Sequence, residues 1–216
     1  MIVYYLVRDL GHIYLRLFRG FGVENADVIP AAGPVIICPN HAHWFDPVIV
    51  AAACPRRPIT FMAKSELFRS PMMNWLYRSL WAFPVRRGQI DRAALRTCFE
   101  RLGQGHALGL FPEGARSRTG ELRQPEPGAA TIALRTGATV IPVGIRGNLG
   151  GQVKVAWGRP LDPADFGGAS RGRGRQGVQA LSNEIMRSIA ELCGRPAPAP
   201  LVLAADRVSG RQEAQE

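Results

Sequence analysis

Apolar residues recur along the chain with two different periods, and the period changes from one short segment to the next. Segments with an unbroken or alternating apolar pattern predict strands, and segments with apolar positions three and four residues apart predict helices. This alternation of strands and helices predicts an α/β fold. The predicted strands or extended segments are residues 34–38, 59–64, 82–87, 107–111, 139–145 and 152–157, and the predicted helices are residues 46–54, 72–81, 91–102, 128–137 and 178–193.

The first 20 residues carry an amphipathic pattern of their own. On a helix, one face would be apolar and the opposite face mainly basic. Two arrangements fit: an interfacial helix whose apolar side chains enter a lipid surface while arginines meet phosphate headgroups, or a surface helix packed on its own domain. We expect the interfacial arrangement. The apolar positions are Ile2, Val3, Leu6, Leu10, Ile13, Tyr14, Leu17 and Phe21, and the polar positions are Arg8, Asp9, His12, Arg16 and Arg19.

The rest of the chain predicts one domain with a loose end. The sequence has no uncharged apolar run of about 18 residues, so no transmembrane helix is predicted, and early charges argue against a cleaved signal peptide. Gly and Arg dominate residues 164–177, which predicts a loop. We expect a membrane-associating helix over residues 1–20, one domain over residues 21–195, and a flexible Pro-rich, then polar tail over residues 196–216.

Composition adds a strong positive charge. The 216 residues carry a formal net charge of +10, and arginine supplies nearly all of it because Lys64 and Lys154 are the only lysines. Either Arg is abundant together with Ala, Gly and Pro through a general bias, or the partner is anionic: a phosphate-bearing substrate, an anionic lipid or nucleic acid. No helix-turn-helix, zinc-finger or aromatic-basic pattern supports nucleic acid. The four cysteines lack C-x-x-C spacing, which argues against a disulfide framework and fits a reducing compartment.

His41 and Asp46, in the segment "NHAHWFD", are the first candidates for chemistry. Their side chains would diverge on a continuous helix, so they can meet only across a turn, which the predicted strand end and helix start supply. The carboxylate could then accept a hydrogen bond from one imidazole nitrogen and leave the other nitrogen as a base. Two alternatives stay open: Asp46 as a helix cap, or a metal site with His43, for which no further strong ligand lies near in sequence.

Two other segments carry charged candidates. "LFPEGARSRTG" delivers Glu113 into a glycine-containing turn followed by Arg116 and Arg118, and such a turn can bind an anion through backbone amides and guanidinium groups. In "FPVRRG", alternation points Arg86 and Arg87 to opposite sides, so that one of them can face a site. The alternative in both cases is a solvated basic surface.

Together these segments resemble the glycerolipid acyltransferase family of the 1-acylglycerol-3-phosphate acyltransferase type. The family's H-x4-D box resembles residues 41–46, its F-P-E-G-x-R block resembles residues 111–116, its motif arginine corresponds to Arg87, and its strand proline to Pro142. The similarity runs from about residue 20 to residue 162. Two departures bear on the choice of acceptor: position 43, often serine in the family, is histidine, and the often basic segment before Gly128 reads "RQPEPG".

The resemblance implies a single-domain mixed sheet flanked by helices. It implies transfer of a fatty acyl group from acyl-CoA or an acyl carrier protein thioester to the hydroxyl of a lysoglycerolipid, most simply 1-acylglycerol-3-phosphate, in phospholipid biosynthesis. His41 would be the base and Asp46 its partner. Arg87 and Arg116 would hold the acceptor phosphate, in a pocket shaped by Glu113 and Gly114.

The same resemblance implies no metal and no cofactor beyond the thioester cosubstrate. The expected partners are an anionic membrane surface, a lysoglycerolipid and acyl-CoA or acyl carrier protein, not nucleic acid, and the expected location is the cytoplasmic face of a membrane. Two alternatives remain: transfer to another lyso-lipid, such as a lysophospholipid or an aminolipid, or a non-catalytic basic protein that binds membranes or nucleic acid.

Overall fold

The computed structural model describes residues 1–86, 88, 91–117, 119–147, 151–167 and 174–203. These residues form a mixed sheet in the strand order β1-β7-β6-β2-β5-β3-β4, in which β6 and β7 are antiparallel and the other neighbours are parallel. The predicted α/β fold with a mixed sheet is confirmed. The strands are β1 (Gly22–Glu24), β2 (Val35–Pro39), β3 (Ile59–Lys64), β4 (Phe83–Val85), β5 (Ala107–Gly109), β6 (Thr139–Arg146) and β7 (Lys154–Trp157).

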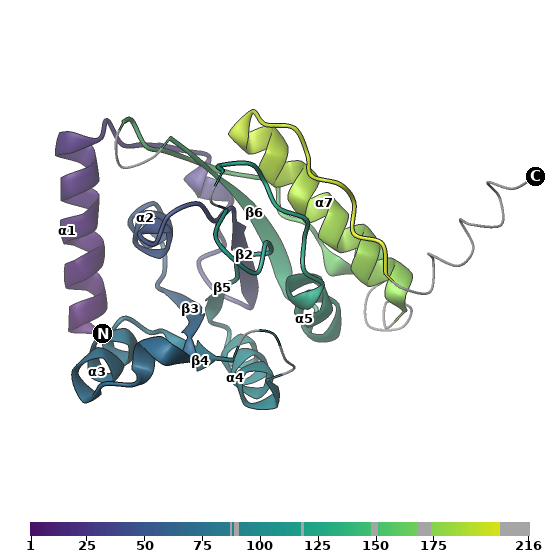
Figure 1. Ribbon diagram of the computed structural model, residues 1–216, viewed down its shortest axis with the longest axis horizontal. Coiled ribbons are helices and arrows are strands. Elements are labelled where there is room, and N and C mark those ends of the chain that lie inside the picture. Colours follow the sequence, from purple (N-terminus) through teal and green to yellow (C-terminus); the bar gives the residue numbers. More distant parts are fainter. Residues whose placement is uncertain (87, 89–90, 118, 148–150, 168–173, 204–216) are drawn as a thin grey trace, which may run out of the picture.

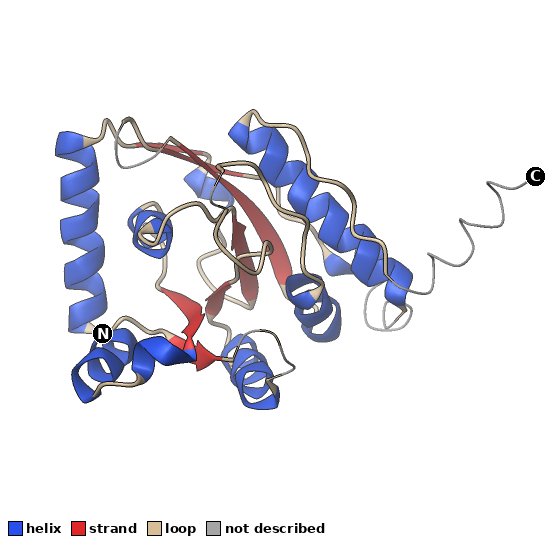
Figure 2. Ribbon diagram, in the orientation of Figure 1, coloured by secondary structure: helices blue, strands red, loops and turns tan. Residues whose placement is uncertain are grey.

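Helices cover both faces of this sheet (Figures 1 and 2). Side chains alternate between the faces along β2, as the pleat requires. Ile36 and Cys38 pack with α4, α5 and α7, whereas Val35 and Ile37 pack with α1 and α2. Two apolar cores therefore hold β2 between them, so the loop that follows β2 starts from a fixed position. The helices are α1 (Ile2–Phe18), α2 (Asp46–Ala52), α3 (Pro71–Ser79), α4 (Arg92–Gly103), α5 (Gly128–Thr136) and α7 (Arg175–Cys193), with 3-10 turns η1 (Ala26–Val28), η2 (Ser65–Phe68) and η3 (Pro163–Phe166).

The elements expected from periodicity lie close to their predicted bounds, with local differences. Strand β1 was not predicted, because three residues are too few to show a period. Helix α7 begins three residues before the predicted start at residue 178, and takes up the end of the predicted Gly/Arg loop. Residues 196–203 of the predicted tail lie along α7, where Leu201 N–H donates to Asn183 Oδ1 and Leu203 N–H to Gln179 Oε1.

Helix α1 packs on the domain by a face that periodicity did not indicate. Its buried residues are Tyr4, Gly11 and Leu15, and the Tyr4 hydroxyl accepts a hydrogen bond from Ile59 N–H at 2.9 Å. The glycine allows α1 to approach α2, because a Cβ at Gly11 would lie 2.8 Å from Val48 Cγ1. The apolar stripe largely faces outward: Ile2, Leu6, Leu10, Ile13, Tyr14 and Leu17 are exposed, whereas Val3 is half-buried and Phe21 is buried. The alternative in which the whole apolar stripe packs on its own domain is therefore wrong.

None of the described helices is both long enough and apolar enough to cross a membrane. The N-terminus lies beside α3, at the end of α1 farthest from β1 (Figure 1). Helices α1 and α3 contact each other there, and the rings of Tyr4 and Trp81 lie 6.4 Å apart. Helix α3 therefore adjoins the N-terminal end of α1.

Candidate active site

His41 and Asp46 meet across the turn between β2 and α2. The distance from His41 Nδ1 to Asp46 Oδ2 is 2.9 Å, and both side chains are almost completely buried. Because the backbone N–H groups of Ala42 and His43 both donate to Asp46 Oδ2, this oxygen acts as an acceptor, and His41 Nδ1 carries the shared proton. The lone pair of neutral His41 then lies on Nε2, where it can accept a proton from a substrate hydroxyl.

Asp46 organises the whole turn around His41. Its Oδ2 also accepts hydrogen bonds from the backbone N–H groups of Ala42 at 2.8 Å and His43 at 2.7 Å. The alternative in which Asp46 caps α2 is wrong, because the helix begins at Asp46 itself, after Phe45 in the cap position, and has no side-chain cap. The carboxylate points back into the turn because its donors are there.

His43 is held in a different way from His41. Its Nδ1 accepts a hydrogen bond from Phe45 N–H at 3.2 Å, so the neutral ring carries its proton on Nε2. A ring in this state is a hydrogen-bond donor at its free nitrogen. His41, with a carboxylate on Nδ1 and a lone pair on Nε2, is therefore the better placed base of the two.

Glu113 reaches the same turn from the neighbouring strand. It follows β5, which pairs with β2 in parallel, so the carboxyl ends of both strands lie at the same edge of the sheet. Glu113 Oε1 accepts a hydrogen bond from His41 N–H at 2.7 Å, and Oε2 accepts one from Arg123 N–H at 3.0 Å. Burial raises the pKa of Glu113, and the two N–H donors act in the opposite direction. Glu113 thus fixes the backbone of His41 to the loop after β5.

The loop after Glu113 also holds the carbonyl side of His41. Ser117 N–H donates to the His41 carbonyl at 2.7 Å. Gly114 has a φ of +67°, a conformation that favours glycine, and a Cβ there would lie 2.7 Å from Glu126 Cγ, so a larger residue would also have to displace the Glu126 side chain. Arg116, next to Ser117, is exposed to solvent, where an anionic ligand can reach it.

Of the two arginines that follow β4, the structure describes only Arg86. Arg86 is exposed and lines a cleft described below. Arg87, the predicted phosphate ligand, lies outside the described residues. The structure therefore brings together His41, Asp46, Glu113 and Gly114 with the loop of Arg116.

A cleft of about 680 Å³ lies next to this turn. It shares Glu113 and Phe111 with the site, and the Phe111 ring stacks on the His41 imidazole with 3.9 Å between centroids. Much of its wall is apolar and the lining also includes charged groups, so it could hold a substrate with a hydrocarbon part and an anionic part. The apolar wall includes Met62, Val85, Leu95, Leu110 and Ile132, and the charged groups are Arg86, Glu113, Arg123 and Glu126.

Two supporting residues, Asn40 and Ser117, were not singled out from the sequence, and a third, Phe111, entered only as part of the F-P-E-G-x-R block. Asn40 exchanges two hydrogen bonds with the backbone of Ile145 on β6, at 2.7 and 3.1 Å, and so continues the pairing of β2 beyond its last strand residue. Ser117 and Phe111 contact His41 as described above. The position of Asn40 directly before His41 was the only sequence signal available, because its partner lies 105 residues away.

The part of the chain that the structure describes contains no group of three or more His, Cys, Asp or Glu side chains that could hold a metal ion. His106, for which the sequence offered no partner, packs edge-on against Trp81 with 5.2 Å between ring centroids.

Comparison with known proteins places this site in a family. The profile of the family described as Acyltransferase matches residues 20–146, which include the turn of His41 and Asp46 and the loop of Glu113. The chain belongs to the Acyltransferase family. The resemblance noted in the sequence is confirmed, and members of this family transfer an acyl group from a donor to an acceptor.

Similar proteins carry consistent names. The chain is 30% identical over 161 residues to a 1-acyl-sn-glycerol-3-phosphate acyltransferase of Bacillus subtilis, covering 71% of this chain and 80% of that protein. It is 32% identical over 113 residues to a lyso-ornithine lipid O-acyltransferase of Pseudomonas aeruginosa, covering 52% of this chain and 43% of that protein. The crystal structure of the 1-acyl-sn-glycerophosphate (LPA) acyltransferase PlsC from Thermotoga maritima superimposes with a TM-score of 0.72 at 27% identity, covering 89% of this chain and 80% of that chain.

Proposed function

We propose that this member of the Acyltransferase family is a 1-acylglycerol-3-phosphate O-acyltransferase of phospholipid biosynthesis. It would transfer a fatty acyl group from acyl-CoA or acyl carrier protein to the free hydroxyl of the lysolipid. The observation that carries the proposal is the 2.9 Å contact between His41 Nδ1 and Asp46 Oδ2, at the edge of an apolar cleft with charged groups. The named relatives from Bacillus and Thermotoga support the choice of acceptor.

His41 would act as general base. A hydroxyl is a weak nucleophile at neutral pH, so it needs to lose its proton as it attacks the thioester carbonyl. The hydroxyl proton moves to His41 Nε2, the new C–O bond forms, the C–S bond breaks, and the thiolate takes the proton from the imidazolium. Asp46 stabilises the imidazolium and holds the ring in the required tautomer. The step needs no metal and no cofactor other than the thioester.

Arg116 would bind the phosphate of the acceptor, together with Arg87. Arg116 lies one residue before Ser117, whose N–H bonds to the His41 carbonyl, so a phosphate held here would lie near the base. A guanidinium group can make two parallel hydrogen bonds to a phosphate, which orients as well as attracts it. Glu113 and Gly114 would act by fixing the loop that carries Arg116.

The enzyme would work as a peripheral or monotopic protein at the cytoplasmic face of a membrane. Exposed apolar side chains line α1, including Leu6, Leu10 and Leu17, and Arg8 and Arg16 lie on the same helix. An exposed apolar stripe beside arginines is suited to an anionic lipid surface. The four buried free cysteines agree with a reducing compartment.

A second acceptor is an amine-bearing lysolipid such as lyso-ornithine lipid. The chain is similar to the Pseudomonas enzyme, and it has His43 where the related enzymes often have serine. Both observations favour such a lipid as an alternative acceptor. A zwitterionic acceptor would gain less than a phosphate monoester from the arginines of the site. We therefore rank it second.

The test is to offer the purified protein an acyl thioester with a panel of lysolipids and to identify the product by mass spectrometry. We expect phosphatidic acid from 1-acylglycerol-3-phosphate, and no product from the His41→Ala variant, which should fold normally. Preferential acylation of lyso-ornithine lipid would replace the proposed acceptor. No thioester consumption with any acceptor, or steeply salt-dependent DNA binding instead, would refute the enzyme assignment.

A further inference from the structure

Helix α3 exposes apolar side chains that its own domain does not cover. None of its residues is buried, and Met72 and Trp75 are 71% and 60% exposed. Leu67 on the adjoining turn η2 is also exposed. Large apolar groups that gather on one surface of a soluble domain mark a place where another apolar phase or molecule binds. We refer to Leu67, Met72 and Trp75 as the α3 patch.

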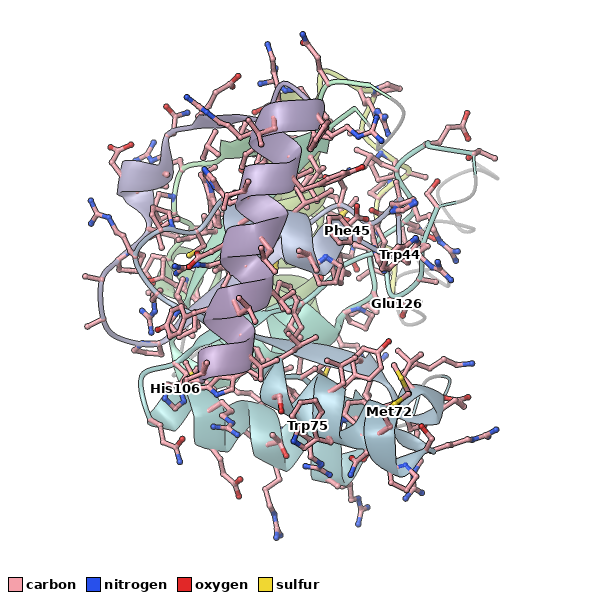
Figure 3. The ribbon with its side chains drawn as sticks, turned by 90° about the vertical axis from the view of Figure 1, so that its left-hand side faces the viewer. Trp44, Phe45, Met72, Trp75, His106 and Glu126 are labelled. Carbon is pink, nitrogen blue, oxygen red and sulfur yellow. The ribbon has the colours of Figure 1, made fainter. Side chains whose placement is uncertain are left out.

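A further exposed tryptophan lies at the active site itself. Trp44 stands between His43 and Phe45 in the turn that links His41 to Asp46, and it is 65% exposed. Figure 3 shows Trp44, Met72 and Trp75 on the side of the molecule on which α1 lies. The exposed stripe of α1, the α3 patch and Trp44 are therefore three separate apolar points on one side of the protein.

We propose that the α3 patch and Trp44 form a second membrane contact, which acts with α1 to turn the mouth of the active site toward the bilayer. This inference rests on the proposed function, because it assumes that the acceptor is a lipid. A single interfacial helix holds the domain only weakly against rocking about the helix axis, because all its contacts lie along one line. Contacts at α1, at α3 and at Trp44 do not lie on one line, so together they fix a plane.

The charges beside the patch favour an anionic bilayer as the occupant. Residues 64–80 contain the cations Lys64, Arg69 and Arg78 and one acid, Glu66. A symmetric dimer through the same patch would bring like charges together, which opposes association. An anionic lipid surface would instead attract them while the apolar side chains enter the interface. Tryptophan suits such a boundary, because its ring is largely apolar and its N–H can stay hydrated.

This orientation has a consequence for the reaction. A lysolipid keeps its acyl chain in the bilayer and exposes its headgroup and free hydroxyl at the surface. With Trp44 inserted beside the turn of His41, the hydroxyl would reach the base without the lipid leaving the membrane. The α3 patch would therefore matter for acceptors embedded in vesicles and not for acceptors dissolved as monomers.

The test compares the double variant Met72→Ser/Trp75→Ser with a control, Val202→Ser, which changes an exposed apolar residue of the segment along α7. Vesicles of phosphatidylcholine with phosphatidylglycerol serve as the probe. We expect the partition coefficient of the double variant to fall about tenfold or more, since two apolar side chains lose their burial in lipid. Turnover of vesicle-embedded lysolipid should fall with it. Turnover of a short-chain lysolipid below its critical micelle concentration should stay unchanged. The Val202→Ser control should keep the partition coefficient and the turnover of the parent protein.

Tryptophan fluorescence tests insertion without any assay of activity. In a Trp81→Phe background, which removes a third tryptophan that is not buried, brominated lipids should quench Trp75 in a Trp44→Phe variant and Trp44 in a Trp75→Phe variant, and quenching should be lost when both are replaced. Trp157 is buried and should not respond. Vesicle binding and quenching by a protein with no acyltransferase activity would overturn the proposed function and leave the membrane contact intact. Unchanged partition without quenching, or a dimer that the double variant converts to monomer, would overturn the membrane contact itself.

Discussion

The Glu113 carboxylate accepts a hydrogen bond from the backbone N–H of His41 at 2.7 Å, although 72 residues separate them in sequence. The other oxygen of the same carboxylate accepts the N–H of Arg123. One buried side chain thus joins the turn after β2 to both ends of the loop after β5. In this role Glu113 positions the base and need not contact the substrate.

Glu113→Gln should lower kcat with little change in the KM for the acceptor. The amide has only one acceptor atom, so one backbone N–H loses its partner and faces an NH2 group. Leaving a buried group unpaired costs about 1–3 kcal/mol, and we expect kcat to fall about tenfold to a hundredfold. Steady-state kinetics on both substrates would measure this, with the exposed Glu121→Gln as the matched control. A selective rise in acceptor KM would instead show that Glu113 binds substrate.

Asp46→Asn should reduce turnover more strongly than it reduces stability. The side-chain amide is close in shape, but it cannot both accept the His41 Nδ1 proton and stabilise the imidazolium as a carboxylate does. Loss of assisted proton transfer predicts a decrease in kcat of about 10²- to 10⁴-fold. Single-turnover kinetics would test this, with far-ultraviolet circular dichroism to confirm folding. Activity within about twofold of the parent protein would remove the pair from the mechanism.

The site was predictable from sequence where its geometry is local, and not where it depends on the sheet. The turn that joins His41 to Asp46, five residues further on, follows from a strand end before it and a helix start after it. The bond between Glu113 and His41 requires β2 and β5 to be neighbours, and no local pattern reveals strand order. The role of Asn40 was not predicted for the same reason, since its hydrogen-bond partner lies on β6.

In the helices, too, sequence predicts local properties but not tertiary contacts. Periodicity predicted the amphipathic character of α1 and α3, because it depends only on residue spacing. It could not show that α1 packs through Tyr4, Gly11 and Leu15, since burial depends on what lies opposite. The same limit applies to α3, whose Met72 and Trp75 fit a core-facing helix and are nevertheless exposed.

Arg116→Ala should weaken binding of the acceptor and leave the thioester's apparent affinity unchanged. A hydrogen bond to a charged group contributes about 1.5–3 kcal/mol, so we expect the KM for 1-acylglycerol-3-phosphate to rise about tenfold to a hundredfold. The matched control is Arg159→Ala, which removes an exposed arginine that lines a different cleft. With a lysolipid that lacks the phosphate monoester, the Arg116 variant should equal the parent. A penalty that persists with that lysolipid would argue against a phosphate contact.

Gly11→Leu should weaken the attachment of α1 to the domain. A Cβ at this position would already lie 2.8 Å from Val48 Cγ1, and the branched valine cannot turn aside, so the helix has to shift. Overpacking of this kind costs about 1–3 kcal/mol, which lowers Tm by roughly 2–4 °C per kcal/mol in a domain of this size. Gly103→Leu on α4 is the control, because no atom lies within 4 Å of a Cβ built there. Val48 lies on α2 close to Asp46, so a displaced α1 should also lower kcat. Thermal unfolding would measure the change in Tm, and kinetics on a monomeric acceptor would measure the change in kcat. Equal Tm values for the two leucine variants would show that α1 is not held at Gly11.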